Sequence, residues 1–465
     1  MNKYYLGIDL GTSSIKGIIK STNGEIYKTK VKYSVATPEG WLETMGKLFS
    51  EFQAEILENI VAIGLSSQVG TYVINEKDVI HWHTDIGLKE LNTVKSKISP
   101  EKFKSEISML HPDLISYPLP RLLYIQEKYG EKAEVLMPKE LLIRALTGNT
   151  VTDVFSMRGI ADPENEKYAD EIKKILGIKL SLPTLKGSFD LAGRVTKEAE
   201  KAFGIKAGVP VYLGCNDFFA GLLGMGVYEK DDAFDLSGTS EHLGYIGEDI
   251  NESAFVSGKY FNGYCSYGGT KSSGPSCDLA INTFGIDDLD IDELLMNSPP
   301  IFLPYLNGER APIFDGEARG VYFGLSSSTS KKELAYSALE GVVFSLYDIA
   351  TSMNMPTPKR LICGGGSAGN ELMNKLRASI FDCDVVSVTE NDTSALGACM
   401  IAMIGDGAYT DVKEAIAECV QYKKPITPDK KYKDILRKRF TVYKELYQSL
   451  KPTFRKFNEI KEITK

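Results

Sequence analysis

The sequence predicts an α/β protein built from two similar halves, and three observations lead to this fold class. The 465 residues are too many for one ordinary core and indicate two domains of about 200 residues each with a short tail. Strand and helix patterns alternate along the chain, as they do in α/β domains. The segment FDLSGTSEHLGYI (234–246) resembles IDLGTSSIKGII (8–19), which indicates an internal duplication.

The first half opens with the pattern of a three-stranded meander. Residues 4–9 and 15–20 are predicted strands on either side of a Gly/Thr/Ser turn, and an Asn-Gly pair at 23–24 predicts a hairpin turn before a third strand. A later helix, PKELLIRALTG, has Pro138 and Gly148 at positions that suit helix ends.

The duplication also predicts where the domains begin and end. The second half has a strand that ends in a glycine cluster, RLICGGGSAGN, where the first half has a strand that ends at 66–68. We therefore expect domains at residues 1–228 and 229–421. The lysine-rich tail, residues 422–465, is expected to form an amphipathic helix with a solvated charged face.

Composition favours a small-molecule partner in a reducing compartment. The net charge is -8 and the lysines are scattered, so no basic stripe for nucleic acid or an anionic membrane is expected. The seven cysteines show no CxxC pair, which argues against a disulfide framework or a zinc site. The amino terminus enters a strand without a secretory signal, and the most apolar later window contains Asn216 and Asp217. We expect a cytoplasmic protein without a membrane span; a homodimer is a possible assembly.

A turn of small residues in each half predicts a pair of phosphate sites. Gly11, Thr12 and Ser13 offer N–H groups and hydroxyls to phosphate oxygens, and Asp9 before them can hold Mg²⁺ directly or through water. An ordinary hairpin explains one such turn equally well. Because the pattern returns at 237–240, the sequence favours two hairpins that grip ATP across an interdomain cleft, as in actin-like ATPases.

The glycine cluster of the second half is a candidate adenosine site. Gly364, Gly365 and Gly366 lie between the strand RLIC and the helical pattern NELMNKLRASIF, so the backbone can approach a ligand closely at a helix start. A plain strand-to-helix turn is the alternative. The later segment ENDTSALGACMIAMIGDG supplies an apolar helix that can pack beneath this turn.

Asp217 is the candidate catalytic base. It follows the apolar strand VYLGC and precedes FFAGLLGMG, so its carboxylate is expected at the carboxyl end of a strand, where crevices of open α/β sheets lie. A kinase that phosphorylates an alcohol needs such a carboxylate near the attacking hydroxyl. A helix N-cap is the alternative role for this aspartate.

Ordered motifs along nearly the whole chain resemble the FGGY family of carbohydrate kinases. GERAPIFDGEARGVYFGLS (308–326), followed by ALEGVVFSLYDIA, resembles the carboxyl-domain signature, and MPKELLIRALTGNTVTD resembles the amino-domain signature. The segments DLGTSS, GCNDFFAGLLGMG, SGTS, GGGSAGN and ALGA fall in family order. The resemblance implies two ribonuclease-H-like, actin-like domains that close on ATP and a sugar and exclude water.

The resemblance also implies a role for each matching residue. Residues 1–228 would form the sugar and phosphate side, and residues 229–421 the nucleotide side. The implied site residues are Asp217 as catalytic base, Asp9 as magnesium site, Thr12, Ser13, Gly238 and Thr239 in the phosphate loops, and Gly365, Gly366 and Asn370 beside adenosine.

Two loops depart from the family pattern and leave the sugar undecided. After Gln68 the chain has Val-Gly, where xylulokinases carry Met-His-Gly and glycerol kinases carry Arg-Glu. The family's Trp-Asn-Asp-Gly-Arg segment corresponds to 82–87, which lacks the arginine. Gln68, Trp82 and Asp85 are candidate sugar contacts, with a solvated loop around a packed tryptophan as the alternative. The pair at 241–242, Glu-His, stands where small residues are usual, and its histidine is expected at the surface.

These patterns together predict an enzyme that uses ATP and Mg²⁺ to phosphorylate a hydroxyl of a small sugar or polyol. A ketopentose such as xylulose ranks first, and gluconate or another polyol is the nearest alternative. Two other classes stay open: an actin-like ATPase that drives a conformational change, and a sugar-binding regulator without catalysis. Acceptor-stimulated ATP turnover distinguishes the kinase from both.

Overall fold

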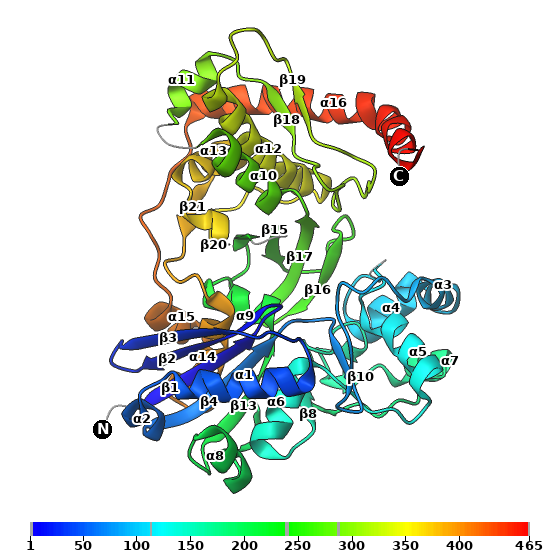
Figure 1. Cartoon of the computed structure of the whole chain (residues 1–465), viewed down its shortest axis with the longest axis vertical. Coiled ribbons are helices and arrows are strands. Elements are labelled where there is room, and N and C mark those ends of the chain that lie inside the picture. Colours follow the sequence, from blue (N-terminus) through cyan, green and yellow to red (C-terminus); the bar gives the residue numbers. More distant parts are fainter. Residues whose placement is uncertain (1–2, 112–113, 238–240, 286–288, 464–465) are drawn as a thin grey trace. The chain divides into compact units, whose positions relative to one another are not determined.

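The computed structural model describes residues 3–111, 114–237, 241–285 and 289–463, and the chain forms two compact units (Figure 1). Unit 1 comprises Met1–Tyr228, Gly258–Asn262 and Asp392–Val420. Unit 2 comprises Glu229–Ser257, Gly263–Asn391 and Gln421–Lys465. The chain therefore returns to unit 1 twice after leaving it.

The described part of unit 1 contains a six-stranded sheet in the order β12-β13-β4-β1-β2-β3. Its strands are β1 (Tyr4–Leu10), β2 (Ser14–Ser21), β3 (Ile26–Lys32), β4 (Ile60–Ser67), β12 (Leu191–Arg194) and β13 (Pro210–Asn216). The predicted meander is confirmed, since β1, β2 and β3 pair antiparallel. Because β4 and β13 run parallel to β1, these three strands end at the same edge of the sheet.

Helices and short strands complete unit 1. The helices are α1 (Pro38–Ser50), α2 (Ala54–Glu58), α3 (Leu88–Lys97), α4 (Pro100–Ile107), α5 (Pro118–Tyr129), α6 (Pro138–Thr147), α7 (Asp170–Leu176), α8 (Lys197–Phe203), α9 (Asp217–Gly224), α14 (Thr393–Gly405) and α15 (Val412–Cys419). The short strands are β5 (Tyr72–Ile74), β6 (Asp78–Ile80), β7 (Val135–Leu136), β8 (Val151–Asp153), β9 (Ala161–Asp162), β10 (Lys167–Tyr168) and β11 (Thr184–Lys186). The predicted ends of α6 are confirmed: Pro138 begins the helix, and Gly148 caps it with a φ of 76° that glycine adopts easily.

Helix α14 lies directly on the sheet of unit 1. A Cβ placed on Gly7 of β1 would lie 2.0 Å from Ala395 O, and one on Gly64 of β4 would lie 2.0 Å from Ala398 O. Bare glycines on both strands therefore let the helix backbone approach this closely. This apolar helix, which the sequence interpretation offered as packing for the glycine turn at 364–366, belongs to unit 1 and has its main contacts with β1, β4 and α9.

The described part of unit 2 contains a second six-stranded sheet, in the order β16-β17-β15-β14-β20-β21. Its strands are β14 (Ala233–Ser237), β15 (Glu241–Gly247), β16 (Val256–Tyr260), β17 (Gly263–Thr270), β20 (Arg360–Gly365) and β21 (Asp384–Ser387). Here β14, β15 and β17 are antiparallel, and β20 and β21 run parallel to β14. This arrangement repeats that of β1, β2, β3, β4 and β13, so the predicted duplication is confirmed.

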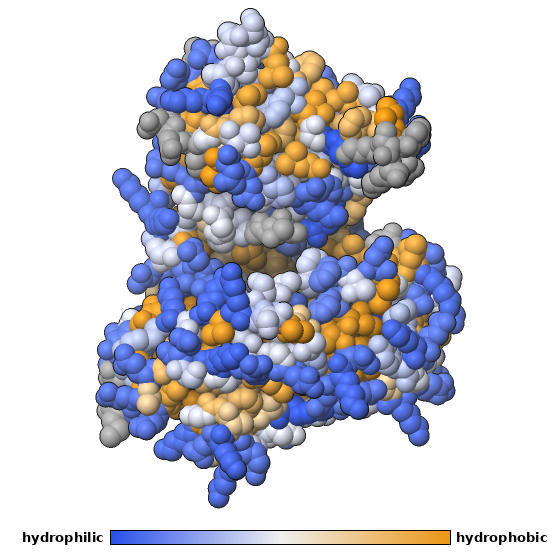
Figure 2. Space-filling view, in the orientation of Figure 1, coloured by the Kyte–Doolittle hydropathy of each residue, from blue (hydrophilic) through white to orange (hydrophobic). Residues whose placement is uncertain are grey.

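Helices of very different lengths accompany this second sheet. They are α10 (Ser273–Leu279), a π-helical turn (Ala280–Phe284), α11 (Ile291–Met296), α12 (Lys331–Ser352), α13 (Glu371–Phe381) and α16 (Lys430–Ile463), and the short strands are β18 (Ile301–Leu303) and β19 (Val321–Phe323). The predicted terminal helix is confirmed as α16, which buries Tyr443 and joins its hydroxyl to that of Tyr305 at 2.6 Å. In the space-filling view, hydrophilic and hydrophobic residues are interspersed on the visible face (Figure 2). In the described ranges, no helix combines the length and apolar character needed to cross a membrane.

Candidate active site

The edge of the first sheet brings three predicted site residues together. In the strand register, Asp9 pairs with Ser66 across β1 and β4, and Asn216 pairs with Ser67 across β4 and β13. Asp217 follows β13 directly, and Gln68 follows β4, where its N–H donates to Leu10 O at 2.9 Å. The magnesium, sugar and base candidates of unit 1 therefore lie along one edge.

The first predicted phosphate turn is an ordered hairpin tip. The Gly11 N–H donates to Ser14 O at 3.0 Å, and the Tyr33 hydroxyl donates to Gly11 O at 2.8 Å. Thr12 and Ser13 are exposed at the tip. Their hydroxyls can therefore reach a phosphate without displacing a buried neighbour.

Asp217 does not cap helix α9, because its neighbour fills that role. Asn216 is the N-cap of α9, and its Oδ1 accepts from the Phe219 N–H at 2.9 Å. Asp217 is the first helical residue, and its Oδ1 accepts from the Phe218 N–H at 2.9 Å. Burial, reinforced by the charge of Asp9, raises the pKa of Asp217 to about 7. A carboxyl group with this pKa can accept and release a proton near neutral pH.

A lysine that the sequence interpretation missed lies among these carboxylates. Lys16 Nζ is 2.9 Å from Asp392 Oδ1. Burial alone would lower the pKa of Lys16, but the pair with Asp392 and the charges of Asp9 and Asp217 raise it. The position of Lys16 close behind the turn could have suggested it, whereas nothing in the local sequence places Asp392, which precedes α14, in unit 1.

Asp9 fits a magnesium ion that is shared with a phosphate. Its side chain is buried, its Oδ1 accepts from the Ser66 hydroxyl at 3.0 Å, and burial raises its pKa although Lys16 opposes the shift. Among the described residues, no group of three or more His, Cys, Asp or Glu could hold a metal ion by itself. Mg²⁺ in phosphate-transferring sites is held by one or two carboxylates together with phosphate oxygens and water. A nearby cation stabilises the ionised form of the buried Asp9 carboxylate, so this single carboxylate suits that arrangement.

The candidate sugar loops are connected through Thr71. Its hydroxyl donates to Gln68 Oε1 at 3.3 Å and accepts from the Trp82 N–H at 3.2 Å. Trp82 is 39% exposed and Asp85 is exposed, so both side chains can meet a solute. Arg121, fully buried in α5, donates to Trp82 O at 3.3 Å and to Thr84 O at 2.6 Å. The loop has no arginine of its own, but the guanidinium group of Arg121 holds its backbone from α5.

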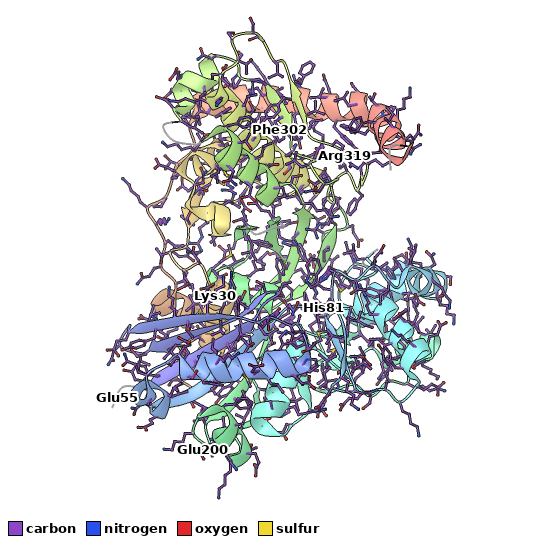
Figure 3. The ribbon with its side chains drawn as sticks, viewed as in Figure 1. Lys30, Glu55, His81, Glu200, Phe302 and Arg319 are labelled. Carbon is purple, nitrogen blue, oxygen red and sulfur yellow. The ribbon has the colours of Figure 1, made fainter. Side chains whose placement is uncertain are left out.

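Two histidines, His81 and His83, lie in the loop that follows β6, whereas His242 lies on a strand of the second sheet. His81, labelled in Figure 3, stacks on His83 with ring centres 5.4 Å apart. The expectation that His242 lies at the surface is wrong: it is half-buried on β15, with its ring 5.9 Å from that of Tyr267. Burial and the charge of Arg310 lower the pKa of His242 to about 3, so it is a neutral packing residue.

The glycine turn of unit 2 lies at the end of β20. Gly364 pairs with Leu236 and Gly365 with Ser237 across β14 and β20. Asn370 is the N-cap of α13, and its Oδ1 accepts from the Met373 N–H at 3.0 Å. The four predicted adenosine residues, Gly364, Gly365, Gly366 and Asn370, therefore lie in one strand-to-helix turn. Gly238 and Thr239, predicted in the second phosphate loop, lie outside the described residues.

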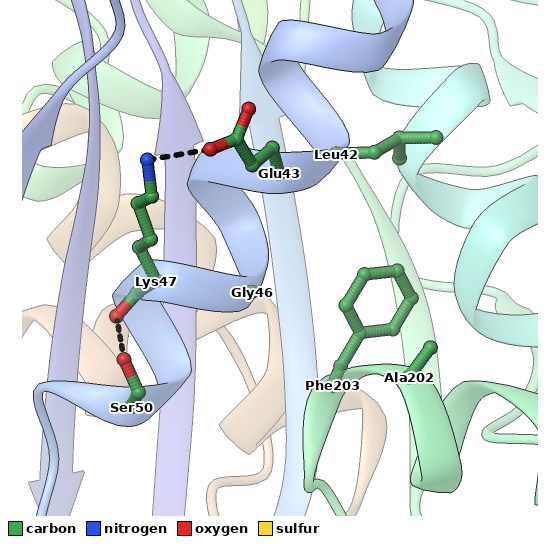
Figure 4. A pocket seen from close by; sticks show the side chains of 7 residues that line it. All are labelled: Leu42, Glu43, Gly46, Lys47, Ser50, Ala202 and Phe203. Carbon is green, nitrogen blue, oxygen red and sulfur yellow. Dashed lines mark hydrogen bonds and ion pairs between the residues drawn. The ribbon is translucent and has the colours of Figure 1, made fainter.

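One of two cavities adjoins predicted site residues, and the other does not. In unit 2, a cavity of about 1010 Å³ begins beside the glycine turn, where Glu371, Leu372 and Lys375 of α13 line it together with Ile291 of α11 and Tyr432 of α16. In unit 1, a cavity of about 480 Å³ lies between α1 and α8 and is lined by residues such as Glu43 and Phe203 (Figure 4). None of the predicted site residues lines the second cavity.

Comparison with known proteins identifies the same two halves. The model of the amino-terminal domain of the FGGY family of carbohydrate kinases matches residues 4–224, and that of the carboxyl-terminal domain matches residues 237–405. The chain is 30% identical to a xylulose kinase of Lactococcus lactis over 98% of this chain and 97% of that protein. Solved structures of a gluconate kinase and a ligand-bound xylulose kinase from Lactobacillus acidophilus each superpose with a TM-score of 0.83 at 25% identity, over 98% of this chain and 100% of theirs.

The duplicated sheets and the matches to both domain models define a kinase of the ribonuclease-H-like, actin-like fold class, which transfers phosphate from ATP to a sugar. Within this class, the chain belongs to the FGGY family of carbohydrate kinases.

Proposed function

We propose that the chain phosphorylates a ketopentose such as xylulose, with Asp217 as the base that activates the accepting hydroxyl. The observation that carries this proposal is the half-buried carboxyl group of Asp217, poised near neutral pKa at the same sheet edge as Asp9. We expect the reaction to take place in the cytoplasm, with a small sugar and ATP as partners rather than nucleic acid or a membrane. The proposed reaction is compatible with a homodimeric protein.

Unit 1 supplies the acceptor and phosphate side. The ionised Asp217 takes the proton of the hydroxyl as that oxygen attacks the terminal phosphorus of ATP. Lys16 offsets the charge of the phosphate oxygens, and the hydroxyls of the turn at 11–13 donate hydrogen bonds to them. Asp9 holds Mg²⁺, which would spread the charge of the phosphates when bound. Gln68, Trp82 and Asp85 orient the sugar.

Unit 2 supplies the nucleotide side. The backbone at Gly364, Gly365 and Gly366, with Asn370 at the start of α13, flanks adenosine. The adjoining cavity of about 1010 Å³ has room for a nucleoside, and its walls combine apolar side chains with carboxylates such as Glu371 and with lysines such as Lys375. Carboxylates accept hydrogen bonds from ribose hydroxyls. This division assigns sugar and phosphate to residues 1–228, the nucleotide to 229–421, and no chemistry to the helical tail, 422–465.

Gluconate is the second candidate substrate, and one observation favours it. Arg158 is buried with its guanidinium carbon 4.7 Å from the ring centre of Phe219, two residues beyond Asp217. An aldonate needs a cation for its carboxylate, and a ketose does not. Xylulose ranks first because the Lactococcus lactis relative that matches over nearly the whole chain is a xylulose kinase.

A screen of ADP release distinguishes these substrates and classes. The full chain is incubated with ATP and Mg²⁺ and, separately, with xylulose, gluconate, glycerol and no acceptor. We expect xylulose to give the fastest acceptor-dependent release. Faster release with gluconate would move the assignment to the sugar acid. Equal release without an acceptor would indicate an ATPase, and calorimetric sugar binding without any release would indicate a regulator.

The raised pKa of Asp217 predicts an acidic limb in the pH profile. Only the ionised carboxylate accepts the proton, so kcat/KM for the sugar should be constant above about pH 7 and fall about tenfold per unit below it. Initial rates from pH 5 to 9, at saturating ATP and with a coupling system verified at each pH, measure this profile. A profile that stays flat down to pH 5 would exclude a base with this pKa.

A further inference from the structure

A buried arginine lies behind the glycine turn of unit 2. Arg377 of α13 is 0% exposed. Its Nε lies 2.7 Å from Asp235 Oδ2, and its Nη2 lies 2.9 Å from Glu241 Oε1. Asp235 belongs to β14 and Glu241 begins β15, and both carboxylates are buried. One cation therefore faces two carboxylates on adjacent strands.

The same guanidinium group reaches the glycine turn. Its Nη2 donates to Ser367 Oγ at 2.7 Å, and its Nη1 donates to Asn374 Oδ1 at 2.9 Å. Asn374 Nδ2 donates in turn to Ala368 O at 2.8 Å. The Ser367 hydroxyl itself donates to Glu241 Oε1 at 3.0 Å. Ser367 and Ala368, the middle of the turn, are thus tied to the sheet by a network in which Arg377 is the central donor. Ser367 also reaches Glu241 directly, and the Ser387 hydroxyl of β21 donates to Ala368 O at 2.7 Å.

The charges of this cluster balance only if one carboxyl group keeps its proton. Burial, followed by the charge of Glu241, holds the pKa of Asp235 well above its ordinary range although Arg377 opposes the shift. Desolvating these groups is costly, and apolar side chains would fill the same space at a lower cost. What an arginine adds is a rigid fork of donors with fixed directions.

We propose that Arg377 is a positioning residue for the nucleotide. By fixing Ser367 and Ala368 against β14 and β15, it keeps the backbone around Gly366 in the shape that admits adenosine. This inference rests on the proposed function, because it takes the turn at 364–370 as the adenosine site. Arg377 itself touches no substrate; it acts through the turn.

The test compares KM for ATP with KM for the sugar in the full chain. Arg377→Met should raise KM for ATP at least tenfold and leave KM for the sugar within twofold of wild type. Arg377→Lys keeps a charge but cannot serve Glu241, Ser367 and Asn374 at once, so a smaller rise is expected. An unchanged KM for ATP in Arg377→Met would overturn the proposal.

A matched control separates positioning from general stability. Arg439 of α16 makes an ion pair with a buried carboxylate in the same unit, with its Nη2 2.6 Å from Glu340 Oε2, away from the glycine turn. Arg439→Met should lower the thermal midpoint about as much as Arg377→Met while leaving KM for ATP within twofold. A similar rise in KM for ATP in both variants would show that Arg377 is merely structural.

Two further measurements keep the result decisive. If Arg377→Met does not fold, Ser367→Ala removes the hydroxyl through which Arg377 and Glu241 hold the turn and leaves the link through Asn374 in place. It should raise KM for ATP about threefold with little change in the thermal midpoint; no rise would contradict the inference. Calorimetric binding of ADP to wild type and to the variants needs no turnover. Wild type that binds ADP without phosphorylating any sugar would refute the proposed function, whereas equal ADP affinity in wild type and Arg377→Met would refute this inference alone.

Discussion

Asp217→Asn is expected to abolish sugar phosphorylation while leaving ATP affinity nearly unchanged. General-base catalysis contributes about 100-fold or more to a rate, so kcat should fall by at least about that factor. The asparagine oxygen can still accept from the Phe218 N–H, which preserves the local structure. Turnover above about a tenth of wild type would contradict the assignment. Asp434→Asn, at an exposed position of α16, makes the same change in net charge and should leave turnover unaltered.

The same variant should be more stable than wild type, with a defined pH dependence. In the folded protein the pKa of Asp217 is raised from 3.8 to about 7, so the wild type loses stability as pH rises between these values. Asparagine does not ionise, so the gain should be absent near pH 4, grow up to pH 7 and stay constant above it. Its limit is about 4 kcal/mol at about 1.4 kcal/mol per pKa unit. Denaturant unfolding at pH 4, 5.5 and 8 measures this difference, and a gain that is equal at all three values would rule out the raised pKa as its cause.

Gly366→Val is expected to raise KM for ATP tenfold or more, which corresponds to about 1.4 kcal/mol of binding free energy, without changing the thermal midpoint. Gly366 is exposed, and a Cβ built on it meets no atom within 4 Å, so the valine side chain occupies space that is open in the protein. Only a nucleotide that approaches this backbone would clash with it. Unchanged ATP kinetics in the folded variant would place adenosine elsewhere.

The neighbouring Gly365→Ala serves as the contrasting variant. Gly365 has a φ of 82°, and a Cβ at this position would lie 1.9 Å from Ser237 O. The substitution therefore strains the backbone and pushes β20 away from β14, which should lower stability by about 1–3 kcal/mol or more. Loss of ATP binding in this variant could come from the strained backbone or from a clash with the nucleotide. Comparison with Gly366→Val separates these two causes, because Gly366→Val adds no strain. A Gly365→Ala protein with the stability of wild type would show that the close approach of the two strands is not required.

Local patterns predicted much of the fold correctly because they depend on residues that are neighbours in the chain. The meander of β1 to β3, the proline and glycine at the ends of α6, and the long terminal helix follow from strand alternation, capping and helical periodicity. The repeat of Asp-Leu and a small-residue turn identified the duplication, which the two sheets confirm. The family signatures added the fold and the kinase class.

The errors and omissions concern residues that only the folded chain brings together. The segment 392–420 follows unit 2 in sequence but packs in unit 1, because glycines on β1 and β4 leave room for α14. His242 looked like a surface residue because its partners, Tyr267 and Arg310, lie on other segments.

Short motifs encode the kinase family, the duplicated fold and the residue types of the proposed site, and their order can be read directly along the chain. The pairing of charges depends on the folded chain, which joins Lys16 with Asp392, places Asp9 near Asp217, and joins Arg377 with Asp235 and Glu241. Sheet register and helix packing set these encounters, and burial then sets the pKa values. Both depend on the whole folded unit rather than on any local pattern.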